Sequence, residues 1–269
     1  GSPKNFWQAT IQFLGRKATR IVKRIVSFSF RNRLKRYKFK LYNQLGHETI
    51  YSRYSILAIG MKEVELKKGF PEHFRWVGPS GASVEAGEDY PLDLTPFRER
   101  KKILVTCGTQ LAWAKENLIY QAKQLAKAHP DCHFFVTRGV GGEAFQCENL
   151  MENLSLVSYL PYKEYIPKMD YVIHHGGAGI FYQCIIYGKP ALILPHDYDQ
   201  FDYAVRGVEA GAAFTAKRDN SKAIGQSFEE LLAKENWPEL ETLRQAAQSY
   251  HPTEILENEI HRLLANKEK

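Results

Sequence analysis

Short apolar runs alternate with stretches of helical periodicity along the chain from residue 101. Ile103 to Thr106 is typical of a buried strand, and apolar residues then recur at helical spacing from Leu111 to Leu125. Further strand-like runs begin at residues 133, 154, 171, 190 and 213, with helix-like or glycine-rich segments between them. Strands that alternate with helices at these intervals predict a parallel, doubly wound α/β sheet.

The N-terminal part follows a different pattern. Between Phe6 and Tyr42, apolar residues recur near helical spacing among many basic ones, which predicts one or two amphipathic helices. Strand-like runs follow at Tyr54 to Ile59 and at Glu63 to Leu66. A stretch rich in glycine and proline then leads to the sheet, and such a stretch is typical of a connector between domains.

These patterns divide the chain into three parts. Residues 1–68 form a basic helical segment, residues 69–100 a linker between domains, and residues 101–269 a Rossmann-like domain. The last fifty residues read as consecutive helices, with Pro238 and Pro252 at their first positions.

The composition is that of a soluble globular protein, with 44% hydrophobic residues and no apolar run near the roughly 20 residues of a membrane-spanning helix. The four cysteines are irregularly spaced and include no C-x-x-C pair, which disfavours a disulfide framework or a zinc site. We therefore expect a cytoplasmic protein in a reducing compartment.

The net charge of +7 is concentrated at the N-terminal end. Residues 1–40 hold twelve lysines and arginines and no acidic residue, whereas the remainder holds 25 basic and 30 acidic residues. One interpretation is that these helices pack beneath a preceding N-terminal domain. The other is that residues 4–40 attract an anionic phospholipid surface and hold the protein at the inner face of the membrane. Nucleic acid is disfavoured, because no aromatic stacking platform accompanies the charge.

Candidate chemistry gathers where the parallel strands end, which is the edge at which doubly wound sheets bind ligands. The strand that begins at residue 171 runs into the sequence His174 to Gly179, and a helix follows at once. Glycines let a ligand approach the backbone, and a helix N-terminus presents free N–H groups to an anion. We expect this segment to bind phosphate, with His175 as a charge-assisted donor and His174 as a packed strand-end residue.

Other loops reach the same edge. Asp199 and Gln200 follow the strand that begins at residue 190 and offer a carboxylate and an amide for sugar hydroxyls. Tyr159 offers a ring on which a nucleobase can stack, and Gly108 with Thr109 can come close to phosphate.

A metal-binding alternative exists in the same loop. Asp197-Tyr198-Asp199 has a D-x-D form, which can hold a sugar diphosphate through a divalent cation. The helix dipole and His175 already supply a positive field here, so we predict neither a metal ion nor a cofactor.

Four separated blocks resemble the donor site of the UDP-glycosyltransferase superfamily, in particular its bacterial macrolide and glycopeptide members. They are Tyr159-Leu160-Pro161, Val172 to Gly179, Gly188 to Pro195, and Asp199-Gln200, and the likeness covers roughly residues 70 to 215. The resemblance implies the C-terminal half of a GT-B fold, which binds a nucleotide-sugar donor.

The resemblance also implies roles for individual residues. The diphosphate would lie on His175 and the following loop, the base on Tyr159 to Tyr162, the sugar on Asp199 and Gln200, and the ribose near Gln183, where many members have glutamate. The candidate binding set is Gly108, Thr109, Tyr159, Tyr162, His175, Gly176, Gly177, Ala178, Gly179, Ile180, Gln183, Asp199 and Gln200.

This sequence departs from the family pattern at several of these positions. Ile180 replaces a usual threonine or serine, Tyr159 a common tryptophan, and Tyr162 a common glutamine. One hydroxyl contact to phosphate is therefore lost, and the identity of the base, uridine or thymidine, stays open.

The predicted function is metal-independent, inverting transfer of a sugar from a UDP- or dTDP-sugar to an acceptor hydroxyl. We expect the catalytic base in an N-terminal domain that this chain lacks, since about 70 residues before the linker are too few for a second doubly wound unit. Two alternatives stay open: a non-catalytic donor-binding subunit of a split, membrane-recruited transferase, and a UDP-sugar epimerase.

Overall fold

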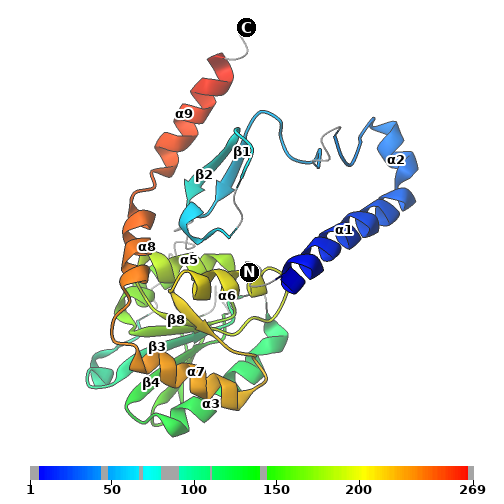
Figure 1. The fold of residues 1–269 in the computed structure, drawn as a ribbon. Coiled ribbons are helices and arrows are strands. Elements are labelled where there is room, and N and C mark those ends of the chain that lie inside the picture. The colour runs from blue at the N-terminus through cyan, green and yellow to red at the C-terminus, as the bar shows by residue number, and fades with distance from the viewer. Residues whose placement is uncertain are drawn as a thin grey trace. The chain divides into compact units, whose positions relative to one another are not determined.

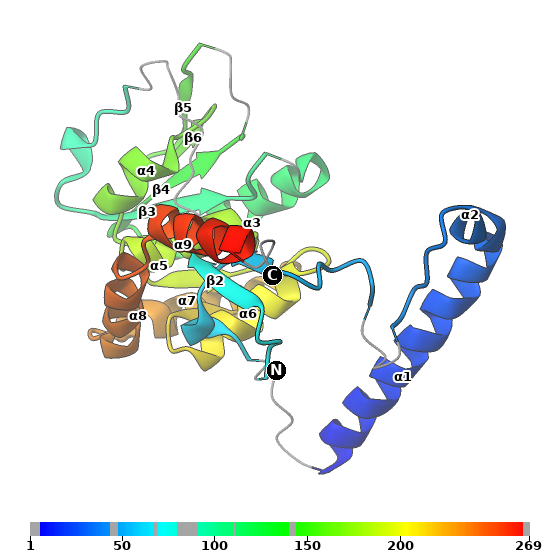
Figure 2. The same cartoon turned by 90° about the horizontal axis from the view of Figure 1, so that it is seen from above.

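The main feature of the computed structural model is a seven-stranded sheet with the strand order β5-β6-β4-β3-β7-β8-β9 (Figure 1). The structure describes residues 6–43, 48–66, 69–79, 91–109, 111–139 and 144–265. The strands of the sheet are β3 (Lys101–Thr106), β4 (Cys132–Thr137), β5 (Cys147–Met151), β6 (Leu154–Val157), β7 (Tyr171–His174), β8 (Ala191–Ile193) and β9 (Ala213–Thr215). Neighbouring strands pair in parallel except β5 with β6, which lie at one edge (Figure 2).

Helices cover both faces of this sheet, so each face has its own hydrophobic core. Side chains alternate along the strands: Leu104 of β3 packs on one core, whereas its neighbours Ile103 and Val105 pack on the other. In Figure 1, α5, α6 and α8 lie on the first face and α3 and α7 on the second. The helices are α3 (Lys115–Ala128), α4 (Tyr162–Tyr165), α5 (Ala178–Ile186), α6 (Gln200–Glu209), α7 (Ser221–Ala233) and α8 (Pro238–Gln248).

The chain divides into two units. One comprises Ile59–Glu65 and Val77–Pro252, and contains the large sheet. The other comprises Gly1–Ala58, Leu66–Trp76 and Thr253–Lys269. It contains α1 (Phe6–Ser29), α2 (Arg31–Arg36) and all but the first residue of α9 (Pro252–Ala265). The contacts therefore group the last helix with the N-terminal segment, a division that differs from the predicted boundaries at 68 and 100.

The predicted fold class is confirmed, and two details of the N-terminal half are corrected. The predicted strand at Glu63 to Leu66 is instead a 3-10 helix, η1 (Lys62–Val64). The predicted linker contains a strand, β2 (Phe74–Gly78), which pairs with β1 (Ile56–Ile59) in a two-stranded sheet. This strand forms by backbone pairing with β1. The glycine and proline content of residues 69–100 had indicated a linker there instead. Residues 80–90 of the predicted linker lie outside the described residues.

The sequence also did not reveal the edge strand β5. Its residues Cys147 to Met151 are mostly exposed and carry no alternating apolar pattern. The strand forms by antiparallel pairing with β6, and the register shifts between Asn149 and Met151. Three short 3-10 helices complete the large unit: η2 (Thr95–Phe97), η3 (Ala112–Ala114) and η4 (Ile166–Lys168).

Candidate functional site

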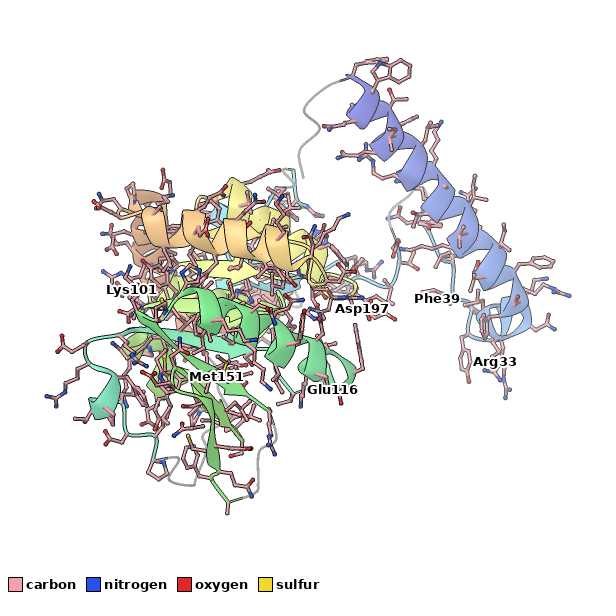
Figure 3. The ribbon with its side chains drawn as sticks, turned by 90° about the horizontal axis from the view of Figure 1, so that it is seen from below. Arg33, Phe39, Lys101, Glu116, Met151 and Asp197 are labelled. Carbon is pink, nitrogen blue, oxygen red and sulfur yellow. The ribbon has the colours of Figure 1, made fainter. Side chains whose placement is uncertain are left out.

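The strand order reverses between β3 and β7, and this is the position at which doubly wound sheets bind ligands. From β3 the chain continues to β4 and β6 on one side, and from β7 to β8 and β9 on the other. Thr106 pairs with His174 in the parallel register, so the two strands end side by side. Figure 3 shows Asp197, after β8, at the opposite end of the sheet from Lys101, the first residue of β3.

The imidazole of His175 lies against two glycines from different loops. A Cβ on Gly177 would lie 2.5 Å from Nε2 of His175, and a Cβ on Gly108 would lie 3.1 Å from its Cε1. The distance at Gly177 is too short for a side-chain carbon while the ring is in place, and at Gly108 the space is tight and the φ of +66° also favours glycine. The structure thereby brings together the loop after β3 and the loop after β7, as the sequence predicts.

Gly176 shapes the turn between β7 and α5. Its φ of +88° is a conformation that residues with a side chain rarely adopt, and its N–H donates to Nδ1 of His174 at 3.0 Å. A Cβ here would lie 2.9 Å from the backbone oxygen of Gln200. The glycine loop is thus in direct contact with the Asp199-Gln200 segment.

Helix α5 begins at this turn with its first-turn N–H groups free of side-chain caps. Gly177 is the N-cap residue and makes no side-chain hydrogen bond. The N–H groups of Ala178, Gly179 and Ile180 belong to the set that an α-helix leaves unpaired, which an anion can bind. The Ile180 side chain is buried, so this residue offers the site only its backbone.

Gln183 lies one turn further along α5 and is also buried. Its Oε1 has no hydrogen-bond partner among the described residues. A buried acceptor left unpaired costs about 1–3 kcal/mol, so this atom favours a ligand hydroxyl nearby.

The loop between β8 and α6 is fixed by a single side chain. Oε1 of Gln200 accepts hydrogen bonds from the backbone N–H groups of His196, at 2.9 Å, and Asp197, at 3.0 Å. Only the amide NH₂ of Gln200 is then available to a ligand. Asp199 is exposed at the N-cap of α6, so its carboxylate is accessible. Next to it, Tyr198 has a φ of +40° and is 88% exposed.

A buried hydroxyl network behind the site was not anticipated from the sequence. Oγ1 of Thr106 accepts from the Gly108 N–H at 3.0 Å and from the Thr137 hydroxyl at 2.7 Å, and lies 2.9 Å from the Tyr162 hydroxyl. Tyr162, predicted to help hold the base, therefore directs its hydroxyl into the protein, where burial raises its pKa. Tyr159 is half-buried and packs against the hydrophobic core on the α5 side of the sheet. Thr109 is exposed.

Gly139, which follows β4, is another residue that sequence reasoning missed. Its φ is +65°, and a Cβ there would overlap the backbone oxygen of Gly108, at 2.1 Å. The glycine-rich sequence after the second strand was the available signal. Gly139 allows the loops after β3 and β4 to touch, and so supports the position of Gly108.

The charge state of the site differs from the expectation. Burial lowers the pKa of His175 to about 4, although the carboxylate of Asp199 opposes this effect. Burial also lowers the pKa of His174 to about 3. The neutral form of His175 is therefore favoured near pH 7, and its role as a charge-assisted donor to phosphate stays a prediction.

The two histidines should make the protein less stable in mild acid. Unfolded histidine titrates near pH 6.5, whereas His174 and His175 stay neutral until about pH 3 and 4. Between these values the unfolded state binds more protons, so the free energy of unfolding falls as pH falls, by about 1.4 kcal/mol per pH unit and per histidine. Urea unfolding at pH 7 and pH 5 measures this change.

The variant His174→Asn serves as the control for this pH dependence. Its amide oxygen can still accept from the Gly176 N–H but does not titrate, so its stability should depend less on pH. Equal unfolding free energies of the unaltered protein at pH 7 and pH 5 would contradict the assignment.

Comparisons with known proteins agree with this geometry. Residues 141–261 match the family described as "Erythromycin biosynthesis protein CIII-like, C-terminal domain". "Uncharacterized UDP-glucosyltransferase YdhE" of Bacillus subtilis (strain 168) is 24% identical over 172 residues, which are 62% of this chain and 42% of that protein. The "3-alpha-mycarosylerythronolide B desosaminyl transferase" of Saccharopolyspora erythraea is 28% identical over 141 residues, which are 51% of this chain and 32% of that protein.

A solved structure shares the fold. "Spinosyn Rhamnosyltransferase SpnG complexed with thymidine diphosphate" superposes with a TM-score of 0.60 at 17% identity, over 77% of this chain and 57% of that one. The chain spans less than half the length of the two curated relatives. The family match covers residues 141–261, and the fold match covers 77% of the chain. The predicted resemblance is confirmed. Residues 141–261 thus resemble the C-terminal domain of a UDP-glycosyltransferase, and the chain shares the GT-B fold.

Proposed function

We propose that this chain binds the nucleotide-sugar donor in the transfer of a sugar from UDP or dTDP to an acceptor hydroxyl. The observation that carries the proposal is the position of His175 between Gly108 and Gly177, directly before the uncapped N-terminus of α5. Three backbone N–H groups and one imidazole converge there, and such an arrangement suits the two phosphates of an activated sugar. The thymidine diphosphate held by the spinosyn rhamnosyltransferase supports this class of ligand.

Each part of the donor has a matching group in this proposal. The diphosphate lies on the N–H groups of Ala178 to Ile180, and the ribose offers a hydroxyl to the unpaired Oε1 of Gln183. The sugar lies between the carboxylate of Asp199, which accepts hydrogen bonds, and the free NH₂ of Gln200, which donates one. Tyr159 and Tyr162 flank the base.

The proposed reaction is a single inverting displacement at the anomeric carbon. As the bond to the diphosphate breaks, negative charge grows on the departing oxygen, and the α5 N-terminus and His175 stabilise it. We propose that no metal ion takes part, and we assign no catalytic base. A further domain or a partner subunit would hold the acceptor and supply that base.

The test is calorimetric titration with UDP, dTDP and GDP, with and without magnesium. UDP or dTDP should bind without the metal and better than GDP. His175→Ala should weaken binding by about ten- to a hundredfold, because it removes a hydrogen bond to a charged group. His175→Gln, which keeps an N–H donor, should lose less. Binding that demands magnesium would transfer the role to Asp197 and Asp199, and binding unchanged in His175→Ala would remove the imidazole from the site.

We also propose an anionic membrane surface as the partner of residues 4–40. Support comes from charge: these residues contain twelve basic and no acidic side chains. Residues 4 and 5 lie outside the described residues. Among the helices that the structure describes, none has the length and apolar content needed to cross a bilayer.

A further inference from the structure

Helix α1 carries a continuous apolar stripe that nothing in the described chain covers. Residues that recur near helical periodicity form it, and each is more than half exposed: Trp7, Ile11, Leu14, Ile21, Val22 and Ile25. No residue of the 24-residue helix is buried. Contiguous exposed apolar surface of this kind marks an interaction site in soluble proteins.

The opposite side of α1 is strongly basic. At helical spacing, Arg16, Arg20 and Lys23 face away from the stripe, and Lys17 and Arg24 flank it. Figure 3 shows side chains projecting all along this helix. Lys23 forms an ion pair with Glu48 at 2.5 Å. Residues 6–43 contain no aspartate or glutamate, so the helix has no acidic side chain of its own to balance this charge.

A helix of this kind needs a partner to be stable. Helices in proteins derive most of their stability from packing of the apolar face, and isolated helices are marginal in water. The partner of α1 must present an apolar region beside a negatively charged one, along about 36 Å for 24 residues. A second copy of α1 would cover the stripe but would double the uncompensated basic charge.

We propose that α1 lies in the plane of an anionic phospholipid bilayer. Its stripe from Trp7 to Ile25 enters the boundary between head groups and acyl chains, while the basic side contacts lipid phosphates. Interfacial helices combine these features: a broad apolar face, a basic polar face and an aromatic residue at one end. The inference rests on the proposed membrane partner and is independent of sugar transfer.

Helix α2 and the residues before it also combine basic side chains with exposed apolar ones. Its last turn contains Arg33, Lys35 and Arg36, and none of its residues is buried. Phe28 and Phe30, which precede α2, are both at least half exposed, and the Arg31 guanidinium lies 4.5 Å from the centre of the Phe28 ring. Apolar rings beside basic groups thus continue past the end of α1.

The experiment is sedimentation of the full chain with vesicles of phosphatidylcholine alone or mixed with phosphatidylglycerol. The protein should bind the anionic vesicles, and less at 0.5 M than at 0.1 M salt. Arg16→Gln/Arg20→Gln should weaken binding roughly thirtyfold, at about fivefold per basic residue. Ile11→Gln/Ile21→Gln should weaken it at least about tenfold, since two side chains lose their apolar surroundings. Glutamine is a good helix former, so neither variant disfavours the helix.

A matched control removes the same charge elsewhere. Lys217 and Lys222 are exposed residues of the large unit, so Lys217→Gln/Lys222→Gln should bind vesicles within about twofold of the unaltered protein. An equal loss in this control would mean that net charge alone drives binding, and full binding by Ile11→Gln/Ile21→Gln would mean that the stripe does not enter the bilayer. Either result overturns the proposal.

Two further measurements separate the rival explanations. If the stripe instead joins two copies of this chain, the unaltered protein sediments as a dimer in the ultracentrifuge and Ile11→Gln/Ile21→Gln as a monomer. That outcome also overturns the proposal. Titration with UDP should give the same affinity for the α1 variants as for the unaltered protein, because no residue of α1 is buried. Failure of donor binding and failure of vesicle binding are therefore observed independently.

Discussion

Gly176→Ala is expected to abolish measurable UDP binding and to lower the free energy of unfolding by about 3–5 kcal/mol. Two effects add at this position. The backbone φ of +88° strains any residue with a side chain, and the new methyl group would lie 2.9 Å from the backbone oxygen of Gln200 and 3.0 Å from Ile193. Backbone cannot move aside as a flexible side chain can, so the turn or the Asp199-Gln200 segment must shift. Urea unfolding and calorimetric titration with UDP measure the two losses.

Gly179→Ala is the matched control for this prediction. A Cβ at Gly179 meets nothing within 4 Å, and its backbone φ lies outside the region that requires glycine. Alanine favours a helix by about 1 kcal/mol over glycine, so stability should stay the same or rise. If Gly176→Ala proved as stable as this control, the turn after β7 would not have the conformation described. If Gly179→Ala kept its stability but lost UDP, the ligand would approach the backbone at that residue.

Gln200→Ala should cost about 2–4 kcal/mol of stability, because two backbone N–H groups lose their acceptor at once. The amide oxygen accepts from His196 and Asp197, and the side chain is only 8% exposed. This result alone would not show whether Gln200 also binds sugar, since a displaced loop moves Asp199 as well.

Gln200→Glu separates the structural role from binding. A carboxylate can accept from both N–H groups and suits the first position of α6, where the helix dipole favours negative charge. It lacks the NH₂ donor, however. We therefore expect stability near that of the unaltered protein, UDP affinity reduced less than about threefold, and affinity for the probe UDP-glucose reduced about tenfold. Equal losses for UDP and UDP-glucose would exclude a contact between Gln200 and the sugar.

The neutral state of His175 has a mechanistic consequence. The neutral form of a buried imidazole with a lowered pKa is stable near pH 7. The negative charge of a diphosphate would favour the protonated form. In this arrangement the positive partial charge of the α5 N-terminus attracts the donor first. In the proposed reaction the neutral His175 donates its N–H to the diphosphate, and this hydrogen bond strengthens as negative charge grows on the departing oxygen, which stabilises the transition state more than the bound donor.

Much of the sheet was predictable from the sequence because its strands are buried. Ile103 to Thr106 and Tyr171 to Ile173 read as strands since a parallel strand covered on both faces is continuously apolar. Helix α8 was located by Pro238, whose fixed φ and missing N–H suit a first helical position. The glycines after β7 indicated the tight turn into a helix on which the proposed anion site depends.

Other features depend on contacts between residues far apart in the chain, and no local pattern encodes them. The strands β2 and β5 pair with β1 and β6. The residues of β5 are mostly exposed and lack a strand pattern, whereas β2 has strand-forming residues within a stretch rich in glycine and proline. The hydrogen bonds that Thr106 makes with Thr137 and Tyr162 join three segments, and the low pKa of His175 comes from burial by surrounding segments. The sequence alone thus determined which residues form the strands and the glycine turn, because these follow from local periodicity and backbone freedom. Only tertiary structure decided hydrogen-bond partners, burial and charge, because those are properties of neighbours in space.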